Sequence, residues 1–145
     1  MVVITRSSRR YRLPIACDST LSKTDQVVLQ DDVQVELFDG RTLLIPKGFI
    51  SDFHSTPRAM WSLVPAYHNR TNLAALVHDY LYMHFDELNP DLVKDNPRKY
   101  ADQAYLMLMQ QFNPLQPAKN LLYYAGVRAG GWYNWRKFRR AAALH

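Results

Sequence analysis

The sequence predicts an α+β protein, with a small antiparallel β-sheet or hairpin in the N-terminal half and three helices in the C-terminal half. Two observations carry this prediction. Valine-rich, partly alternating residues surround an Asp-Gly pair before residue 50, and three apolar segments after residue 70 have helical spacing and start signals. With 145 residues, of which 48% are hydrophobic and 21% charged, the chain suits a single globular domain over residues 1–145.

The strands are expected on either side of one turn. The run QVVLQDDVQVELF precedes Asp39-Gly40, and a second apolar run, RTLLIPKGF, follows it. An Asp-Gly pair between two such runs is typical of a hairpin, because glycine adopts the positive φ angles that a tight turn requires. Pro46 and Gly48 are expected to end the second strand. Residues 2–6 and 10–16 are expected to add an edge strand.

Three helices are expected in the second half of the chain. Their expected ranges are 71–85, 97–112 and 117–130. Asn69 or Thr71 would cap the first helix, and a proline opens each of the other two, which is a favoured position in the first turn. The Gly130-Gly131 pair is expected to break the third helix before a basic tail helix. The link at 49–70 lacks clear periodicity, and long ordered connections are often functional.

The charge is distributed unevenly. The chain has 18 basic and 13 acidic residues, and all 13 acids lie within residues 18–116. The basic ends, residues 1–17 and 131–145, are expected to be appendages of the domain. Basic ends could be solvated termini or could contact nucleic acid or an acidic protein. The residues proposed for such contacts are Arg136, Lys137, Arg139 and Arg140.

Composition and sequence pattern exclude several classes of protein. The single cysteine, Cys17, excludes a disulfide framework and a cysteine-rich zinc site within one chain. No apolar stretch approaches the roughly 20 residues that a membrane-spanning helix needs. The N-terminus also lacks the continuous apolar segment of a secretory signal.

The first helix carries two ionisable residues in an otherwise apolar environment. His78 and Asp79 follow LAALV and precede YLYM, so this helix is expected to be central and buried. A buried carboxylate needs a metal, an arginine or hydrogen-bond donors. Asp102 lies beside the apolar face of the second helix, and helices joined by a loop of this length usually run antiparallel. We therefore expect Asp102 to pair with His78 and to fix its tautomer.

The link contributes further oxygen atoms. Asp52 and Ser55 follow the second hairpin strand, and they could either cap a turn or lie over the helix that carries His78 and Asp79. In the second case, Asp52 and Asp79 would be metal ligands. Oxygen ligands with one imidazole suit Mg²⁺, Mn²⁺ or Ca²⁺, or Zn²⁺ with fewer ligands.

Three ordered motifs resemble the DUF1353 family, a group of phage and prophage proteins of unknown function. They are PKGFISDFHSTPR, then LVHDYLY, then RKYADQAYLMLM. The family pattern maps onto residues 48–58, 78–82 and 98–102, so Ser55, Arg58, Tyr82 and Arg98 become supporting residues of a candidate site. His54 departs from the pattern, which usually has a small residue there.

A second resemblance concerns the arrangement of the candidate site. His-Asp-x-x-Tyr on one helix, with an aspartate on an antiparallel neighbour, is similar to the secreted phospholipases A2. The resemblance implies that His78 is the base for water, Asp79 a metal ligand and Asp102 the residue that orients His78, with Tyr82 bonded to Asp102. The chain lacks the disulfides and the glycine-rich calcium loop of those enzymes, so the likeness implies nothing about a lipid substrate.

Three functional hypotheses follow. The first is a non-enzymatic phage protein, in the virion or tail or acting on a host protein, in which His78 bonds Asp102 and Arg58 or Arg98 pairs with Asp79. The alternative is a hydrolase, metal-dependent or not, acting on an envelope polymer such as peptidoglycan. The third is nucleic-acid binding through the basic ends. The family resemblance implies other phage or host proteins as partners, and the host cytoplasm or the virion as location.

Overall fold

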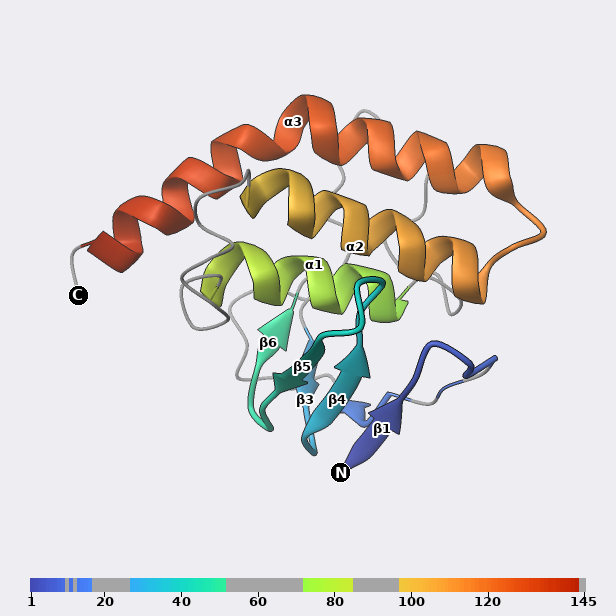
Figure 1. Ribbon diagram of the computed structural model, residues 1–145. Helices are drawn as coiled ribbons and strands as arrows, with labels where there is room; N and C mark the ends of the chain where they lie inside the picture. The colour runs from blue at the N-terminus through green and yellow to red at the C-terminus, as the bar shows by residue number, and fades with distance from the viewer. Residues whose placement is uncertain (10, 12, 17–26, 52–71, 85–96, 144–145) are drawn as a thin grey trace.

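The computed structural model describes residues 1–9, 11, 13–16, 27–51, 72–84 and 97–143. Within them, six short strands precede three helices, so the predicted α+β class is confirmed. Figure 1 shows the helices as stacked layers, with α1 facing the strands, α2 beside it and α3 on the outside. The helices are α1 (Asn72–His84), α2 (Pro97–Phe112) and α3 (Pro117–Ala143).

The first sheet contains the predicted hairpin. It consists of β1 (Val2–Ile4), β4 (Val33–Glu36) and β5 (Thr42–Ile45), in the order β1-β4-β5. β4 and β5 pair antiparallel around a turn in which Gly40 has a φ of 86°. Residues alternate between buried and accessible along both strands, as expected for a sheet with one face on the core. β1 pairs parallel to β4, so this sheet is mixed rather than purely antiparallel.

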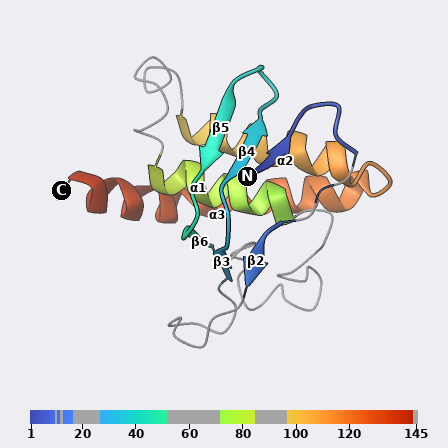
Figure 2. The same ribbon diagram turned by 90° about the horizontal axis from the view of Figure 1, so that it is seen from below.

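The second sheet explains why the valine-rich run forms two strands. β2 (Ile15–Ala16), β3 (Val27–Leu29) and β6 (Ile50–Ser51) pair antiparallel in the order β2-β3-β6. The chain leaves this sheet after β3 and enters the other sheet at β4. Asp32 lies between them, where its carbonyl accepts from Val2 N and its carboxylate from Lys47 N. Figure 2, seen from the side of the strands, shows them in front of α1.

Antiparallel helix packing places the middle of each helix against the others. Tyr11 contacts Phe112, and its hydroxyl accepts from Leu73 N, so the start of α1 lies near the end of α2. The residues proposed to cap α1, Asn69 and Thr71, lie outside the described residues. The buried core joins helices and strands, and its largest fully buried members include Tyr105, Leu29, Leu37, Leu43, Ile45, Leu73, Leu76, Leu81 and Met109.

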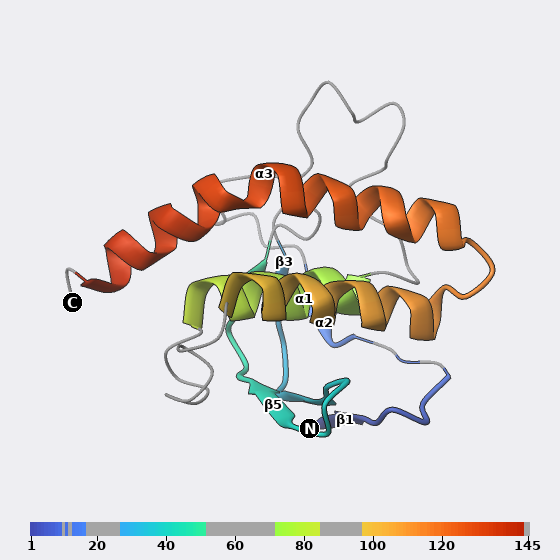
Figure 3. The same cartoon turned by 45° about the horizontal axis from the view of Figure 1, so that its top comes forward.

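The prediction that Gly130-Gly131 breaks the third helix is wrong. α3 continues to Ala143, and its C-terminal part extends beyond the ends of α1 and α2 (Figures 1 and 3). The reason is packing, since Gly131 is buried against α1. A Cβ atom at this position would lie 2.6 Å from the Tyr82 hydroxyl oxygen. Glycine costs about 1 kcal/mol in a helix relative to alanine, and close contact between the helices offsets that cost.

Among the described residues, no helix is long and apolar enough to cross a bilayer.

Candidate functional site

The centre of the candidate site is a buried carboxylate. Asp102, on α2, has no solvent exposure. Its Oδ1 lies 2.7 Å from His78 Nε2 and accepts a second hydrogen bond from the Tyr82 hydroxyl at 2.7 Å. Its Oδ2 accepts from Arg128 Nη1 at 2.8 Å. Two helices, α1 and α3, therefore supply partners to one carboxylate on α2, which satisfies the need of a buried charge for compensation.

Regular helix geometry explains how α1 supplies two of these partners. His78 and Tyr82 are four residues apart, so their side chains leave the same face of α1. Asp102 lies on the buried face of α2, which packs against that face of α1. Asp102 accepts from the Arg128 guanidinium and from the Tyr82 hydroxyl, so we assign the hydrogen of a neutral His78 ring to Nε2, where it donates to Asp102. The tautomer of a neutral His78 ring therefore leaves Nδ1 as its acceptor nitrogen.

Two tyrosine rings pack close to the His78 ring. The Tyr82 ring lies 4.2 Å from it between centroids, and the Tyr105 ring lies 4.9 Å away. Its side chain keeps 10% exposure. Within the described part of the chain, Nδ1 makes no hydrogen bond. The ring is thus fixed through one of its two nitrogens.

Burial keeps the surrounding tyrosines neutral. The pKa of Tyr82 is raised mainly by burial, and the negative charge of Asp102 raises it further. Burial also raises the pKa of Tyr105, with further contributions from Tyr123, Asp79 and Asp102. A protonated Tyr82 is a reliable donor to Asp102 in the neutral pH range. Asp79 is half-buried, and its negative charge contributes to the raised pKa of Tyr105.

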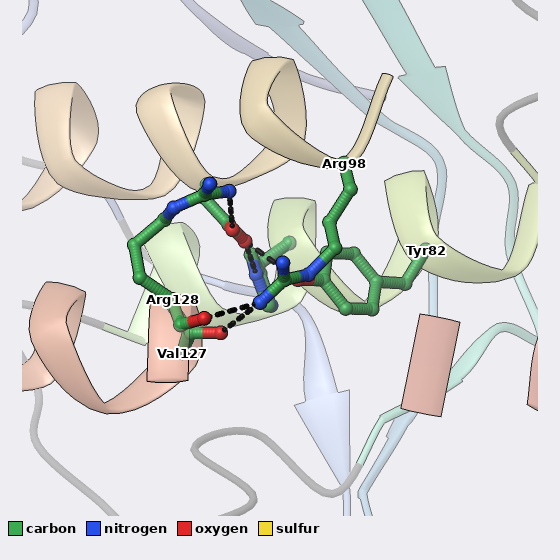
Figure 4. A network of polar contacts seen from close by, with 6 residues as sticks. Tyr82, Arg98, Val127 and Arg128 are labelled. Atoms are coloured by element: carbon green, nitrogen blue, oxygen red, sulfur yellow. Dashed lines mark hydrogen bonds and ion pairs between the residues drawn. The ribbon is translucent and has the colours of Figure 1, made fainter. Parts of the chain in front are cut away.

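Arg98 attaches α3 to this cluster without touching Asp102. Figure 4 shows Arg98 reaching toward α3 next to Tyr82, while Arg128 approaches the carboxylate from α3 itself. Arg98 Nη2 donates to the carbonyl oxygens of Val127 and Arg128, the first at 3.0 Å. It also lies 3.5 Å from the position that a Cβ atom of Gly131 would occupy. The close approach of α3 is therefore part of how the site is assembled.

The structure brings together part of the predicted set. His78, Asp102 and Tyr82 meet, and Arg98 lies beside them. Asp79 follows His78 on α1. The other predicted members of the site, Asp52, Ser55 and Arg58, lie outside the described residues, as does His54. Arg98 Nη2 donates to two carbonyl oxygens of α3. This nitrogen therefore does not take part in the proposed pairing of Arg98 with Asp79. The roles of all these residues stay predictions.

Sequence reasoning missed Arg128. Its guanidinium reaches a fully buried acid. A signal does exist in the sequence. Arg128 lies three residues before Gly131 and five after Tyr123, both of which are on the buried face of α3. A single basic residue flanking an inward face, opposite a helix with a buried aspartate, is a candidate ion-pair partner.

The described residues do not by themselves form a metal centre. A divalent cation such as Ca²⁺ takes six to eight oxygen ligands, and Zn²⁺ takes about four ligands. Across the described ranges, no group of three or more histidine, cysteine, aspartate or glutamate residues could hold a metal ion. Asp102 is occupied by three donors, and Asp52 is not among the described residues. We therefore derive no chemical step through a metal.

Comparison with known proteins decides the family. A family model described as "Protein of unknown function (DUF1353)" matches residues 27–127. The chain belongs to this family. The matched part of the DUF1353 protein contains His78, Tyr82, Arg98 and Asp102, and Arg128 is the residue directly after it. Comparisons with curated proteins and with solved structures gave no match.

Proposed function

We propose that this DUF1353 protein is a hydrolase in which His78 is a general base oriented by Asp102. One observation carries the proposal. The Nε2 atom of His78 is bound to a fully buried carboxylate, while Nδ1 makes no hydrogen bond among the described residues and 10% of the side-chain surface remains exposed. A histidine held in one tautomer by a carboxylate is the arrangement that general-base catalysis uses.

The chemistry can be written for an acyl substrate. Nδ1 of His78 would take a proton from a water molecule while the water oxygen attacks the acyl carbon. The resulting imidazolium would be stabilised by Asp102 and would then give the proton to the leaving nitrogen or oxygen. Throughout, the hydrogen on Nε2 stays with the ring. Glycosidic bonds are a poorer fit, because their hydrolysis normally uses two carboxyl groups flanking the bond.

The substrate class we favour is an amide or ester bond of an envelope polymer such as peptidoglycan. The choice of polymer follows from the resemblance to phage and prophage proteins, and the choice of bond follows from the single base. Phage origin, and a location in the host cytoplasm or the virion, belong to the same proposal.

Replacing His78 tests whether its imidazole is the general base. We expect His78→Asn to lower the hydrolysis rate by about 100-fold or more, because general-base catalysis typically contributes 10²–10⁴-fold. Purified sacculi and a series of simple esters would be the substrates, with released amines or acids measured. His84→Asn is the matched control, since His84 lies on the same helix and contacts Phe49 and Tyr80 rather than Asp102. An active, folded His78→Asn protein would refute the proposal.

The metal-dependent version of the hydrolase is tested separately. Elemental analysis of the untagged protein, with Asp79→Asn as the comparison, would detect a bound ion. If Asp79 is a ligand, we expect stoichiometric metal in the original protein and its loss in the variant. Equal metal content in both proteins would remove Asp79 from the proposed ligand set.

A second candidate function is supported by the completeness of the network. Asp102 is saturated by donors from α1 and α3, and such buried networks can specify a fold without any chemistry. On this account the protein is a non-enzymatic phage component, in the virion or tail or bound to a host protein. Absence of hydrolysis, together with a large loss of stability in His78→Asn, would favour it.

A further inference from the structure

The outward side of α3 has an apolar face. Figures 1 and 3 show α3 on the outside of the helical layer, so one of its sides faces away from α1 and α2. Between residues 118 and 130, the exposed positions recur every three or four residues, which is the spacing of one helix face. This face, which we call the apolar face of α3, consists of Ala118, Leu121, Leu122, Ala125, Gly126, Ala129 and Gly130.

This arrangement is the reverse of what a surface helix normally shows. Such a helix turns its charged and polar residues toward water. Here Leu121 and Leu122 are 51% and 42% exposed, while the two charged residues of the same stretch, Lys119 and Arg128, are half-buried. Single exposed leucines are ordinary, but a continuous exposed face without any polar side chain indicates a contact surface.

Two glycines on this face have no explanation within the described part of the chain. Gly126 and Gly130 lie four residues apart, and a Cβ atom at either position would have nothing within 4 Å. Glycine is a poor helix former, and it is often found where another backbone approaches closely. The absence of side chains at these positions would allow a second helix to pack directly on the backbone of α3.

The order of large and small residues identifies the partner that fits. The large residues, Leu121 and Leu122, lie toward the N-terminal end of the face, and the small pair Ala129-Gly130 lies toward its C-terminal end. A second copy of α3, running antiparallel about a twofold axis between residues 125 and 126, would place Leu122 opposite Ala129 and Leu121 opposite Gly130. Each copy then fills the space that the other leaves open, as a twofold interface requires. In a parallel pair, leucine would meet leucine and the small residues would face a gap.

The charge of α3 favours the same orientation. Between residues 117 and 143 the helix has six basic residues and no acidic one, and four of the six lie between residues 136 and 140. A parallel pair would bring these basic segments together. An antiparallel pair would separate them by roughly 35 Å along the helix axis, which is several Debye lengths at physiological salt. A lipid surface fits less well, because five of the seven residues are alanine or glycine and would bury little apolar area.

We propose that the apolar face of α3 is the interface of a homodimer, in which the α3 helices of two copies pack antiparallel about a twofold axis near Ala125 and Gly126. The face is about 18 Å long, so it buries less area than a standard protein interface, and the dimer is weak and reversible. The residues that contact Asp102 and Tyr82, Arg128 and Gly131, lie outside this face. The proposal is therefore independent of the proposed hydrolase function.

Sedimentation equilibrium of the full chain over a series of concentrations tests the dimer. We expect a monomer–dimer equilibrium with a Kd between about 10 µM and 1 mM. A protein that stays monomeric up to about 1 mM, the weak end of that range, would overturn the proposal. Binding of that monomer to vesicles of phosphatidylglycerol and phosphatidylcholine would assign the face to a membrane, and lack of such binding would leave it to a different protein.

A charge at the twofold axis tests whether this face forms the dimer. Ala125→Arg would place two like charges side by side in the interface, so we expect no dimer up to about 1 mM. Gln110→Arg is the matched control, because it adds the same charge at an exposed position of α2 and should leave the Kd unchanged. Circular dichroism would show that both variants are folded. A folded Ala125→Arg protein with the original Kd would place the interface elsewhere and refute the proposal.

Disulfide cross-linking tests the orientation without depending on that variant. In a Cys17→Ser background, Ala125→Cys should cross-link between copies on mild oxidation, since the two cysteines would lie beside the axis. Ala118→Cys should not, because the antiparallel arrangement separates the two cysteines by about 20 Å along the helix. Efficient cross-linking through residue 118, or none through residue 125, would contradict the antiparallel dimer.

Discussion

Single residues on α3 decide how closely the helices approach. Gly131 is buried where its backbone passes the Tyr82 hydroxyl, and the space for a Cβ atom is absent. Gly130, its neighbour, has nothing within 4 Å of the same hypothetical atom. Of these two adjacent glycines, only Gly131 is required by a close contact within the chain.

Alanine at these two positions should have opposite effects. We expect Gly131→Ala to lower the free energy of unfolding by about 1–3 kcal/mol, because overpacking displaces Tyr82 or α3. Gly130→Ala should raise it by about 0.5–1 kcal/mol, since alanine is the better helix former and nothing obstructs it. Urea unfolding followed by circular dichroism measures both values. Equal effects at the two positions would contradict the close approach of α3 to α1.

The turn between α2 and α3 shows how elements are joined. Asn113 and Asn120 are both buried and bond to each other, with Asn113 Nδ2 donating to Asn120 Oδ1 at 3.1 Å. Asn120 Nδ2 donates in turn to the carbonyl oxygen of Asn113 at 2.8 Å. This pair holds the short connection closed and thereby sets the direction in which α3 leaves α2.

Asn120→Ala should weaken this connection. The change removes the two hydrogen bonds that the Asn120 side chain makes with the side chain and the carbonyl oxygen of Asn113, so we expect a loss of about 1–3 kcal/mol in the free energy of unfolding. Leu121→Ala is a suitable control because Leu121 is exposed on the outer face of α3, and its effect should be small. Thermal and urea unfolding would report the difference. A loss in Leu121→Ala as large as that in Asn120→Ala would argue against the asparagine pair.

Tyrosines from both halves of the chain are buried against the helices, and this predicts how the stability of the whole molecule depends on pH. Burial raises the pKa of Tyr11 to about 12 and raises those of Tyr82 and Tyr105 as well. In the unfolded chain, a tyrosine has a pKa of about 10. A pKa that is higher in the folded state contributes stability that is fully present below pH 10 or so and is lost as the pH rises.

We therefore expect the free energy of unfolding to fall above about pH 10, by up to about 1.4 kcal/mol per pH unit for each such tyrosine. Urea titrations between pH 8 and 11, with phenolate absorbance as a second signal, would follow it. Tyr82→Phe should reduce the slope, since it removes one of the contributing groups. A stability that stays level through pH 11 would show that these side chains ionise as easily in the fold as outside it.

Some predictions about the whole protein stay predictions. They are the single domain over residues 1–145, the basic ends 1–17 and 131–145 as appendages, and contacts of Arg136, Lys137, Arg139 and Arg140 with nucleic acid or a protein partner. A salt-dependent gel shift tests the nucleic-acid alternative, because phosphate contacts weaken as salt increases. Absence of binding at low salt would remove it.

Backbone preferences and residue spacing were sufficient to predict several parts of this structure. The Asp39-Gly40 turn and the start of α2 follow from backbone preferences and from proline at the first helical turn, so the sequence determined them. The proximity of His78 and Tyr82 follows from a spacing of four residues on a helix. Asp102 could be expected opposite them because antiparallel helices bring their middles together.

The features that depend on contacts between separate helices and strands were decided only by the tertiary structure. It divided the valine-rich run between two sheets, because Asp32 accepts hydrogen bonds from both β1 and the chain after β5. It kept α3 continuous through two glycines, since contact with Tyr82 favours a residue without a side chain. It also brought Arg128 to Asp102, although 26 residues separate them in the chain. Local preferences act over a few residues, whereas a buried charge finds its partner in the packed core.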